Sequence, residues 1–467
     1  MNLLQAIADP ALFAPWFRDA ATWATWRAFL AALFGLPMTA DQAEVFAKHT
    51  GRTDAPSEPA EEAWLICGRR AGKSFMLALI AVFLACFRDY RPYLQPGERG
   101  TVIIIAADRK QARTIFRYIR GLLSRVPMLA RMIERETADS FDLTNDVSIE
   151  IGTASLRSSR GYTIVAALCD EIAFWQTDDS AANPDQEILD SLRPGSATIP
   201  GAMLLCASSP YARRGALHDA HTRYFGKPGS ILVWKAKTRD MNPNVKQSLV
   251  DRALERDPAA AASEWLAEFR QDISAFVDRQ IIESCVDPNE IERPYKDGKR
   301  YVAFVDPSGG SSDSMTLGIG HREKDSIIVD VVREIVAPFD PESATEEFAK
   351  VLLSYGVRQV TGDRYAGEWP RQAFRKRGIQ YEPSEQPKNA LYTDLLPKLN
   401  SRSIRLLDIG RSVNQLAALE RRSSRGGKDT IDHPPGGHDD VANVIAGVAA
   451  CVSNLARTTW SQQPLGI

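Results

Sequence analysis

Two long stretches of this chain alternate short apolar runs with segments of helix length, and this alternation constrains the fold more than any other feature. In the first stretch, helix-length segments such as Lys73–Phe87 and Asp108–Val126 separate the apolar runs. The apolar runs are Trp64–Gly68, Thr101–Ala107, Val147–Thr153, Thr163–Asp170, Ala202–Ser208 and Ile231–Ala236. Strands separated by helices are typical of α/β domains with a mostly parallel sheet. We therefore predict such a domain here.

A second alternation begins at Tyr301 and predicts a second α/β domain. Its runs of strand length are Tyr301–Asp306, Met315–His321, Ser326–Val332, Val357–Asp363 and Ser403–Ile409. An apolar helix, Asp439–Val452, is expected to close this domain. The chain between the two stretches is polar and helical in character, and Pro243 and Pro258 interrupt it. We expect an N-terminal helical segment (1–40), a first α/β domain (41–234), a lid or linker (235–275) and a second α/β domain (276–467).

Composition excludes several other classes of protein. The 467 residues are 44% hydrophobic and 25% charged, which excludes intrinsic disorder, collagen and coiled coils. The longest apolar stretch, Met76–Phe87, is shorter than the roughly 18 residues of a membrane span, and we expect neither a membrane segment nor a secretory signal. Six scattered cysteines without a CxxC pair favour a reducing cytosol and argue against a zinc site. The net charge of −2 does not exclude a nucleic acid, because binding depends on local basic clusters.

The segment Cys67–Ser74, CGRRAGKS, follows an apolar strand and opens an apolar helix, as a phosphate-binding loop does. In such a loop the backbone N–H groups face the phosphates, Lys73 reaches the outer phosphate oxygens and Ser74 binds Mg²⁺. The loop residues are Gly68, Arg69, Arg70, Ala71, Gly72, Lys73 and Ser74. Cys67 stands where the motif has its first glycine. The alternative is a chance GKS sequence at the start of a helix.

An apolar strand that ends in two acids is expected to complete the nucleotide site. Asp170 and Glu171 end the run Thr163–Glu171, and we interpret Asp170 as the acid on the metal side and Glu171 as the base that orients the attacking water. Charge on the transferred phosphoryl group calls for a guanidinium. The candidates are Arg69, Arg70, Arg157 and Arg160, each of which can equally be a solvated loop arginine.

Two further positions are weaker candidates for the nucleotide site. Ser208 and Ser209 end the next apolar run, where a sensor of the γ-phosphate can stand, although a Ser-Pro turn explains them nearly as well. Gln42, upstream of the loop, is a candidate for reading the adenine edge, and an exposed helical glutamine is the alternative.

Separated carboxylates in the second domain predict a metal-dependent nuclease site. Asp306 and Asp363 each end an apolar strand, and Asp439 and Asp440 begin an apolar helix. Adjacent parallel strands lie about 4.8 Å apart, so acids at the ends of neighbouring strands can share metal ions. Two Mg²⁺ ions held in this way would support phosphodiester cleavage. Taken singly, Asp306 is also explained as a turn residue and Asp439 as a helix cap; Asp313 and His438 are weaker, supporting candidates.

A basic segment, 402–428, is expected to lie beside this second site. It carries seven basic residues and two acids, and a positive surface of this kind suits a phosphate backbone read without sequence specificity. The basic residues are Arg402, Arg405, Arg411, Arg421, Arg422, Arg425 and Lys428. A solvated helix face is the competing interpretation.

Together these motifs resemble those of large terminase subunits of tailed double-stranded DNA phages or prophages. The resemblance covers the chain from about Gln42 to Ala450 and rests on the segments GRRAGKS, LCDEIAFW, CASSP, VDPSGG, TGD and GHDDVANVIAG. The family implies an N-terminal P-loop ATPase, a lid region and a C-terminal RNase H-like endonuclease. It also implies ATP-driven packaging of double-stranded DNA into a procapsid, with cutting of concatemeric DNA.

The resemblance assigns roles by position. It gives Lys73 and Ser74 to nucleotide and Mg²⁺, Asp170 and Glu171 to metal and water, and Ser208 and Ser209 to a coupling segment. It gives Asp306, Asp363 and one of Asp439 and Asp440 to the nuclease metals, which Mn²⁺ is expected to replace. A trans-acting arginine is expected at Arg157 or Arg160. The implied partners are double-stranded DNA, the portal protein, a small terminase subunit and further copies of the chain in a ring, in the host bacterial cytoplasm.

Two other hypotheses remain open at this point. A P-loop helicase or repair nuclease without any capsid would also use both sites, and it predicts strand separation. A non-enzymatic adaptor that binds DNA or capsid would keep both sites only as relics. The retained carboxylates argue against the adaptor, because unpaired buried charges are costly.

Overall fold

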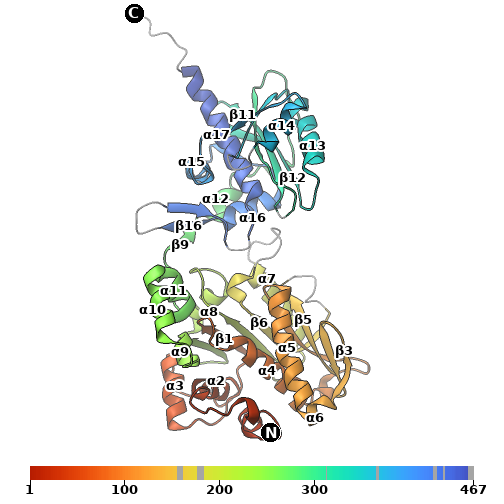
Figure 1. Ribbon diagram of the computed structural model, residues 1–467, viewed down its shortest axis with the longest axis vertical. Coiled ribbons are helices and arrows are strands. Elements are labelled where there is room, and N and C mark those ends of the chain that lie inside the picture. The colour runs from red at the N-terminus through yellow and green to blue at the C-terminus, as the bar shows by residue number, and fades with distance from the viewer. Residues whose placement is uncertain are drawn as a thin grey trace, which may run out of the picture. The chain divides into compact units, whose positions relative to one another are not determined.

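The chain forms two compact units. The computed structural model describes residues 1–154, 161–175, 184–311, 313–363, 368–423, 429–434 and 437–460. Of these residues, those up to Gln271 belong to the first unit and those from Asp272 onward belong to the second (Figure 1). Each unit has its own sheet and its own hydrophobic cores.

The first unit is built on an eight-stranded sheet with the order β3-β4-β5-β2-β6-β7-β1-β8. Its strands are β1 (Glu62–Cys67), β2 (Gly100–Ala106), β3 (Ile133–Glu136), β4 (Ser140–Leu143), β5 (Val147–Thr153), β6 (Thr163–Asp170), β7 (Met203–Ser208) and β8 (Ile231–Ala236). In this sheet order, every neighbouring pair from β5 through β2, β6, β7 and β1 to β8 is parallel. The pairs β3–β4 and β4–β5 are antiparallel. All six predicted apolar runs form strands, and the predicted α/β class with a mostly parallel sheet is confirmed.

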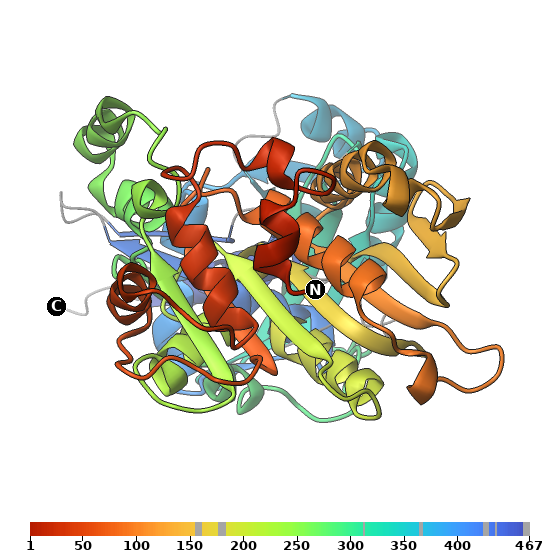
Figure 2. The same ribbon diagram turned by 90° about the horizontal axis from the view of Figure 1, so that it is seen from below.

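Helices cover both faces of this sheet (Figure 2). They are α1 (Leu3–Ala8), α2 (Ala24–Leu33), α3 (Ala40–Thr50), α4 (Lys73–Phe87), α5 (Arg109–Arg125), α6 (Pro127–Ala130), α7 (Pro184–Ser196), α8 (Ala216–Tyr224), α9 (Thr238–Met241), α10 (Gln247–Arg256) and α11 (Pro258–Leu266), with short 3-10 turns at Ala14–Trp16, Arg91–Tyr93 and Ile172–Phe174. Alternate strand residues enter two cores: Leu65 packs on the side of α4, and Ile66 on the side of α7 and α8. Helix α4 is apolar all round, which explains why it is buried on every side.

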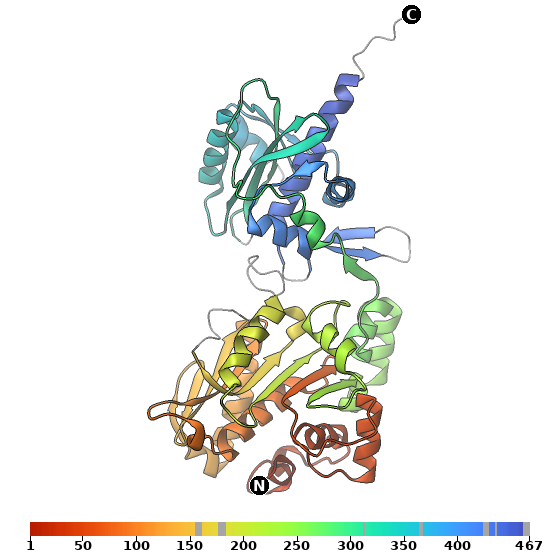
Figure 3. The same ribbon diagram turned by 180° about the vertical axis from the view of Figure 1, so that it is seen from behind.

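The second unit contains a mixed six-stranded sheet with the order β14-β13-β10-β11-β12-β15 (Figure 3). The strands are β10 (Tyr301–Asp306), β11 (Met315–Glu323), β12 (Ser326–Ile335), β13 (Gln359–Gly362), β14 (Gln380–Pro383) and β15 (Ile404–Arg405). The first three form an antiparallel meander, and β13 and β14 continue parallel to β10. This is the strand arrangement of the RNase H-like fold. A separate three-stranded sheet contains β9 (Ile273–Ala275), β16 (Glu420–Ser423) and β17 (Asp429–Asp432).

The last helix, α17 (Asp440–Trp460), packs across this sheet and fixes the position of its own first residue. The close approach depends on glycine: a Cβ atom on Gly447 would lie 2.1 Å from the Phe304 ring. The Thr316 hydroxyl on β11 donates to the Asp440 carbonyl at 2.9 Å and anchors the start of the helix. The other helices of this unit are α12 (Arg279–Glu283), α13 (Pro341–Ser354), α14 (Trp369–Arg375), α15 (Lys388–Asn400) and α16 (Gly410–Ala418).

All six cysteines are free thiols, and Cys67, Cys169, Cys206 and Cys285 are buried. Within the described ranges, no helix is both long enough and apolar enough to serve as a membrane span.

Candidate functional site

The phosphate loop joins the end of β1 to the start of α4. Cys67 is the last residue of β1 rather than part of the loop, and burial raises the pKa of its thiol to about 12. Gly68 therefore opens the loop, and a Cβ atom there would lie 2.2 Å from the Thr238 hydroxyl. Gly72, just before α4, has a φ of +104°, a backbone conformation that favours glycine. The first glycine of the loop is thus Gly68, one residue later than in the motif, and the loop is still tight.

Side chains from outside the motif hold successive carbonyl groups of this loop. Thr238 donates to the Arg69 carbonyl at 2.8 Å, Asn242 donates to the Arg70 carbonyl at 2.8 Å, and the Trp26 indole donates to the Ala71 carbonyl at 3.0 Å. In a planar trans peptide the N–H group points away from the preceding carbonyl. The three following N–H groups are therefore turned to the opposite side, where they can receive an anion.

Lys73 and Ser74 connect the loop to the acid-bearing strand. The Lys73 ammonium is buried, and it lies 3.0 Å from the Ser209 hydroxyl and 3.3 Å from Glu171 Oε1. It also donates to the Cys67 carbonyl at 3.1 Å. The Ser74 hydroxyl donates to Asp170 Oδ2 at 3.2 Å. The two motifs predicted to form one site therefore meet.

The acid pair lies at the end of β6, with β7 between this strand and β1. Burial raises the pKa of Asp170 to about 7, the Glu171 charge adds to this rise, and Lys73 opposes it. Asp170 Oδ1 is buried and has no hydrogen-bond partner among the described residues. A buried carboxylate oxygen beside a serine hydroxyl is the donor set that Mg²⁺ prefers, so these residues fit the predicted ion.

Glu171 is held by the segment after β7. Its Oε2 atom accepts from the Ser208 hydroxyl and from the Ser209 amide, each at 3.1 Å. Glu171 adopts a left-handed backbone with a φ of +51°, which is uncommon for a residue other than glycine. Ser208 and Ser209, predicted as a γ-phosphate sensor or coupling segment, thus contact Glu171 directly, a contact that the sequence did not predict.

The remaining candidates of the nucleotide site have other surroundings. The Arg69 guanidinium lies 2.9 Å from Glu264 Oε1 on α11, and Arg70 is exposed. Gln42 accepts from the Thr39 amide at 3.0 Å and so caps α3. Arg157 and Arg160 lie outside the described residues.

In the second unit, Asp306 and Asp363 follow adjacent strands. Val305 on β10 pairs with Gly362 on β13, so the two acids leave the sheet side by side. A cavity of about 410 Å³ opens at this edge. Its lining residues are Asp306, Pro307, Ser308, Gly309, Asp313, Ser314, Asp363, Trp369 and Asp440. The strand-end acids and the first helix residue are therefore brought together, as the sequence predicts.

Burial and mutual repulsion act on the acids of this cavity. Burial raises the pKa of Asp306 to about 7, and the charges of Asp363, Asp440 and Asp439 contribute, although the Asn443 amide donates to Asp306 at 2.6 Å. Burial and the Asp439 charge raise the pKa of Asp440 to about 6. Asp440 Oδ2 is buried without a hydrogen-bond partner in the described part of the chain. Hard carboxylate oxygens in this state fit Mg²⁺ or Mn²⁺.

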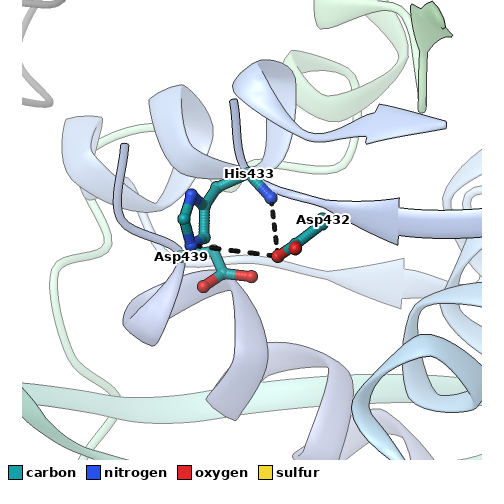
Figure 4. Close-up of side chains that lie close together, drawn as sticks. All are labelled: Asp432, His433 and Asp439. Carbon is teal, nitrogen blue, oxygen red and sulfur yellow. Dashed lines mark hydrogen bonds and ion pairs between the residues drawn. The ribbon is translucent and has the colours of Figure 1, made fainter. Parts of the chain in front are cut away.

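Asp439 has surroundings different from those of Asp440. It accepts from the Tyr392 hydroxyl at 2.7 Å and lies 2.6 Å from the Lys388 ammonium. It also lies near Asp432 and His433, and the three residues offer possible ligand atoms within 4.8 Å of one another (Figure 4). The Lys388 ammonium is also 3.4 Å from Asp432, so a cation of the protein already lies against both carboxylates of this group.

Residues that the sequence did not single out also belong to the cavity. Ser314 and Trp369 line it, and Asn443 holds Asp306, although nothing in their local sequence marks them. Of the supporting candidates, Asp313 lines the cavity, and the His438 ring lies 4.0 Å from both Asp313 and Asp440. His438 is therefore near the opening of the site.

The basic segment of the second unit is less positive than its composition indicates. Within it, Arg411 lies 2.7 Å from Glu334 and Arg422 lies 3.2 Å from Glu420. Arg405 is paired with Asp287, and Arg421 with Asp429. Arg425 and Lys428 lie outside the described residues. These ion pairs reduce the positive surface that was predicted beside the cavity.

Comparisons with known proteins bear on the first unit and on the whole chain separately. Residues 29–266 match the family model described as "Uncharacterized protein MJ0330, N-terminal P-loop domain". This match covers the phosphate loop, the acid pair and the helices α9 to α11. The comparison with curated proteins finds no match.

Solved structures similar to this chain include large terminases, the family that the sequence motifs resemble. The bacteriophage HK97 large terminase is 15% identical with a TM-score of 0.39, over 91% of this chain and 99% of that one. The large terminase of a thermophilic bacteriophage is 12% identical with a TM-score of 0.36, over 84% of this chain and 94% of that one. The large terminase nuclease of another thermophilic phage, G20c, is 15% identical with a TM-score of 0.31, over 34% of this chain and 85% of that one.

Proposed function

The chain belongs to the family of the N-terminal P-loop domain of uncharacterized protein MJ0330, and from this premise we propose that its first unit hydrolyses ATP. We further propose that the second unit cuts DNA and that the whole chain is the large subunit of a phage terminase. Hydrolysis would then drive double-stranded DNA into a procapsid, and the second site would cut concatemeric DNA.

In the proposed ATPase, the residues of the first site bind the phosphates, hold Mg²⁺ and orient the attacking water. The turned N–H groups and the Lys73 ammonium receive the β- and γ-phosphates, and Ser74 and Asp170 hold Mg²⁺. Glu171 orients the attacking water, and its contacts with Ser208 and Ser209 fix its carboxylate. In the present arrangement Glu171 lies 3.3 Å from the Lys73 ammonium. Phosphate entering the loop would compete for this ammonium and free the carboxylate to act on water.

In the proposed nuclease, Asp306, Asp363 and Asp440 would hold divalent ions, which when bound would supply water activation and charge stabilisation at the leaving oxygen. Asn443 fixes the orientation of Asp306 through its hydrogen bond of 2.6 Å. We assign Asp440 and not Asp439 as the third ligand, because Asp440 lines the cavity while Asp439 is paired with Lys388.

A single observation carries the proposal of a second activity. Carboxylates from two strand ends and from a helix start line one cavity of the second unit, and one of their oxygens is buried without a hydrogen-bond partner in the residues described. Such a grouping is unfavourable without a cation. It therefore supports a metal-dependent reaction in addition to the reaction of the phosphate loop.

The partners follow from the motif resemblance and form part of the proposal. They are double-stranded DNA, a portal protein, a small terminase subunit and other copies of this chain in a ring. The proposed setting is the cytoplasm of a host bacterium, with transient attachment to the procapsid portal.

Separate mutations test whether the two activities are independent. Lys73→Ala is expected to abolish ATP turnover and to leave Mn²⁺-dependent cutting of plasmid DNA unchanged, because it removes only the ammonium of the first site. Lys227→Ala, an exposed lysine of the same unit, is the matched control and should retain ATPase activity. Unchanged ATP turnover in Lys73→Ala would overturn the assignment of the first site.

The reciprocal change addresses the second site. Asp363→Ala is expected to abolish DNA cutting and to leave ATP turnover intact, whereas Asp325→Ala, at an exposed turn of the same unit, should preserve both. Metal-dependent cleavage that persists in purified Asp363→Ala would overturn the nuclease assignment. Unwinding of a duplex by the wild-type protein would instead favour a helicase.

A further inference from the structure

Helix α5 presents a continuous basic face to solvent. The helix contains six basic residues and no acidic residue. Five of the six, all exposed, are Arg109, Lys110, Arg113, Arg117 and Arg120. At 3.6 residues per turn they fall within an arc of about 100°. We call these five residues the α5 basic stripe. The opposite face of α5 is buried in a hydrophobic core of the first unit. Figure 1 shows where this helix lies in that unit.

Among the residues that the structure describes, most of the α5 basic stripe has no ion-pair partner. The ion pairs in the described part of the chain include only one of its members, Arg120, which lies 2.6 Å from Glu136. Arg117 donates to the Thr114 hydroxyl at 3.1 Å and not to a carboxylate. Asp108, the residue before the helix, accepts from the Gln111 amide and serves as the N-cap. The stripe therefore keeps most of its positive charge, unlike the arginines of 402–428.

This arrangement is unfavourable within the helix itself. Arg109 and Lys110 occupy the first turn, where the helix dipole disfavours a positive charge by about 0.3–1 kcal/mol each. Arg109 with Arg113, and Arg113 with Arg117, are like-charged neighbours at a spacing of four residues, which costs about 0.2–0.5 kcal/mol per pair. A local conflict of this kind, which only the Arg120–Glu136 pair offsets within the described residues, is typical of a functional surface.

The dimensions and composition of the stripe fit a nucleic-acid backbone better than a protein. From Arg109 to Arg120 the helix rises about 17 Å, and about 17 Å of duplex axis carries about five phosphates on each strand. Arginine, which forms four of the five positions, matches phosphate geometry with two parallel hydrogen bonds. The arc contains no apolar or aromatic side chain, whereas protein interfaces depend on such anchors.

The stripe also starts beside the nucleotide site. Ala106 at the end of β2 pairs with Asp170 at the end of β6, and α5 begins three residues after Ala106. A ligand on the stripe would therefore contact α5, the helix that follows β2. Strand β2 is the direct neighbour of β6, which carries Asp170 at its end.

We propose that the α5 basic stripe binds the phosphate backbone of double-stranded DNA without sequence preference. This inference rests on the proposed function and assigns a DNA surface to the first unit. Each phosphate contact that a basic residue makes releases counterions, so binding should weaken steeply as salt rises.

The test measures the binding of the full chain to a labelled 30-base-pair duplex of arbitrary sequence, in EDTA, across a series of salt concentrations. The variant is the double substitution Arg113→Gln with Arg117→Gln, since glutamine keeps good helix propensity. Loss of two phosphate contacts should lower the slope of log affinity against log salt by about 1.8 and weaken binding at 0.1 M salt by about 60-fold. ATP turnover without DNA should not change.

The matched control is Arg252→Gln with Arg256→Gln on α10. These arginines are also exposed, are also four residues apart and change the net charge equally. The control should keep the wild-type slope. A wild-type slope in the α5 variant would overturn the assignment and favour an acidic protein surface as the partner of the stripe. A wild-type protein that does not bind the duplex would instead overturn the proposed function as a whole.

Discussion

Asp439 and Asp440 are consecutive residues with opposite electrostatic situations. The Asp439 carboxylate has a lysine and a tyrosine hydroxyl as partners, whereas Asp440 faces the cavity and keeps one buried oxygen without a hydrogen bond within the described residues. Asp440 is the first residue of α17 and Asp439 lies just before the helix, so the two side chains leave the backbone in different directions. A sequence places both acids at the same helix start and cannot choose between them.

This contrast predicts different effects of the same substitution. Asp440→Asn should lower Mn²⁺-dependent DNA cutting by more than about 100-fold, because even outer partners of metal ligands contribute about 10–100-fold. Without metal it should not destabilise the fold, since it removes a charge that burial disfavours. Asp439→Asn should retain metal binding but lower the free energy of unfolding by about 1.5–3 kcal/mol, because Lys388 loses a charged hydrogen bond.

Cutting assays and denaturant unfolding of both variants check this prediction. The opposite pattern, with normal cutting in Asp440→Asn and lost metal binding in Asp439→Asn, would move the metal to the group formed by Asp432, His433 and Asp439.

Most of the nucleotide site could be predicted because its charged and hydroxyl residues stand at or just after the ends of apolar strands. Lys73, Ser74, Asp170 and Glu171 lie in contact, as the two motifs indicated. The loop's outer support was not predictable, because Thr238 is 169 positions from Arg69 in sequence and carries no motif. Similarly, the sequence of 402–428 gives no sign that its arginines pair with distant acids such as Asp287 and Glu334.

At the scale of elements, α9 supports the phosphate loop through Thr238. Thr238→Val removes the hydrogen bond to the Arg69 carbonyl while keeping the shape of the side chain. Loss of one such bond, worth about 1 kcal/mol, should weaken nucleotide affinity by about fivefold. Equilibrium binding of a fluorescent ATP analogue measures this effect.

Thr222→Val is the matched control for this change. The Thr222 hydroxyl also donates to a backbone carbonyl at 2.9 Å, but within α8 and away from the loop. Equal affinity in the Thr238 variant and the control would show that α9 does not position the loop.

Packing of α17 on the second sheet gives another prediction for elements. Gly447→Ala places a Cβ atom 2.1 Å from the buried Phe304 ring. Overpacking of this kind costs about 1–3 kcal/mol, which exceeds the gain of about 1 kcal/mol in helix propensity. The free energy of unfolding of the second unit should therefore fall. Urea unfolding monitors the change.

Gly410→Ala provides the comparison for this packing prediction. Gly410 also lies in a helix of the second unit, but an added Cβ there meets no atom within 4 Å. Greater stability of Gly447→Ala than of wild type would show that the sheet and α17 do not require glycine at their contact.

Elements with strong apolar character were predicted, and weakly patterned ones were not. The runs that became β1, β2, β6 and β7 are buried on both faces of a parallel sheet, so they read as continuous apolar segments. The short strands β3, β14, β16 and β17 are polar or half exposed and carry no such pattern. Their pairing depends on neighbours that a single sequence does not identify.

At the scale of the whole molecule, the two proposed activities require two separate sites, one in each unit. The first combines a phosphate loop with a buried acid pair, and the second combines three carboxylates around one cavity. Each site has a buried carboxylate oxygen that lacks a hydrogen bond within the described chain. The central claim is therefore that each unit binds its own divalent ion.

Anomalous diffraction from crystals grown with Mn²⁺ and a slowly hydrolysed ATP analogue tests this claim most directly. We predict one manganese peak beside Ser74 and Asp170, with the analogue in the phosphate loop, and at least one further peak among Asp306, Asp363 and Asp440. The absence of any peak among these three aspartates at millimolar Mn²⁺ would contradict the claim.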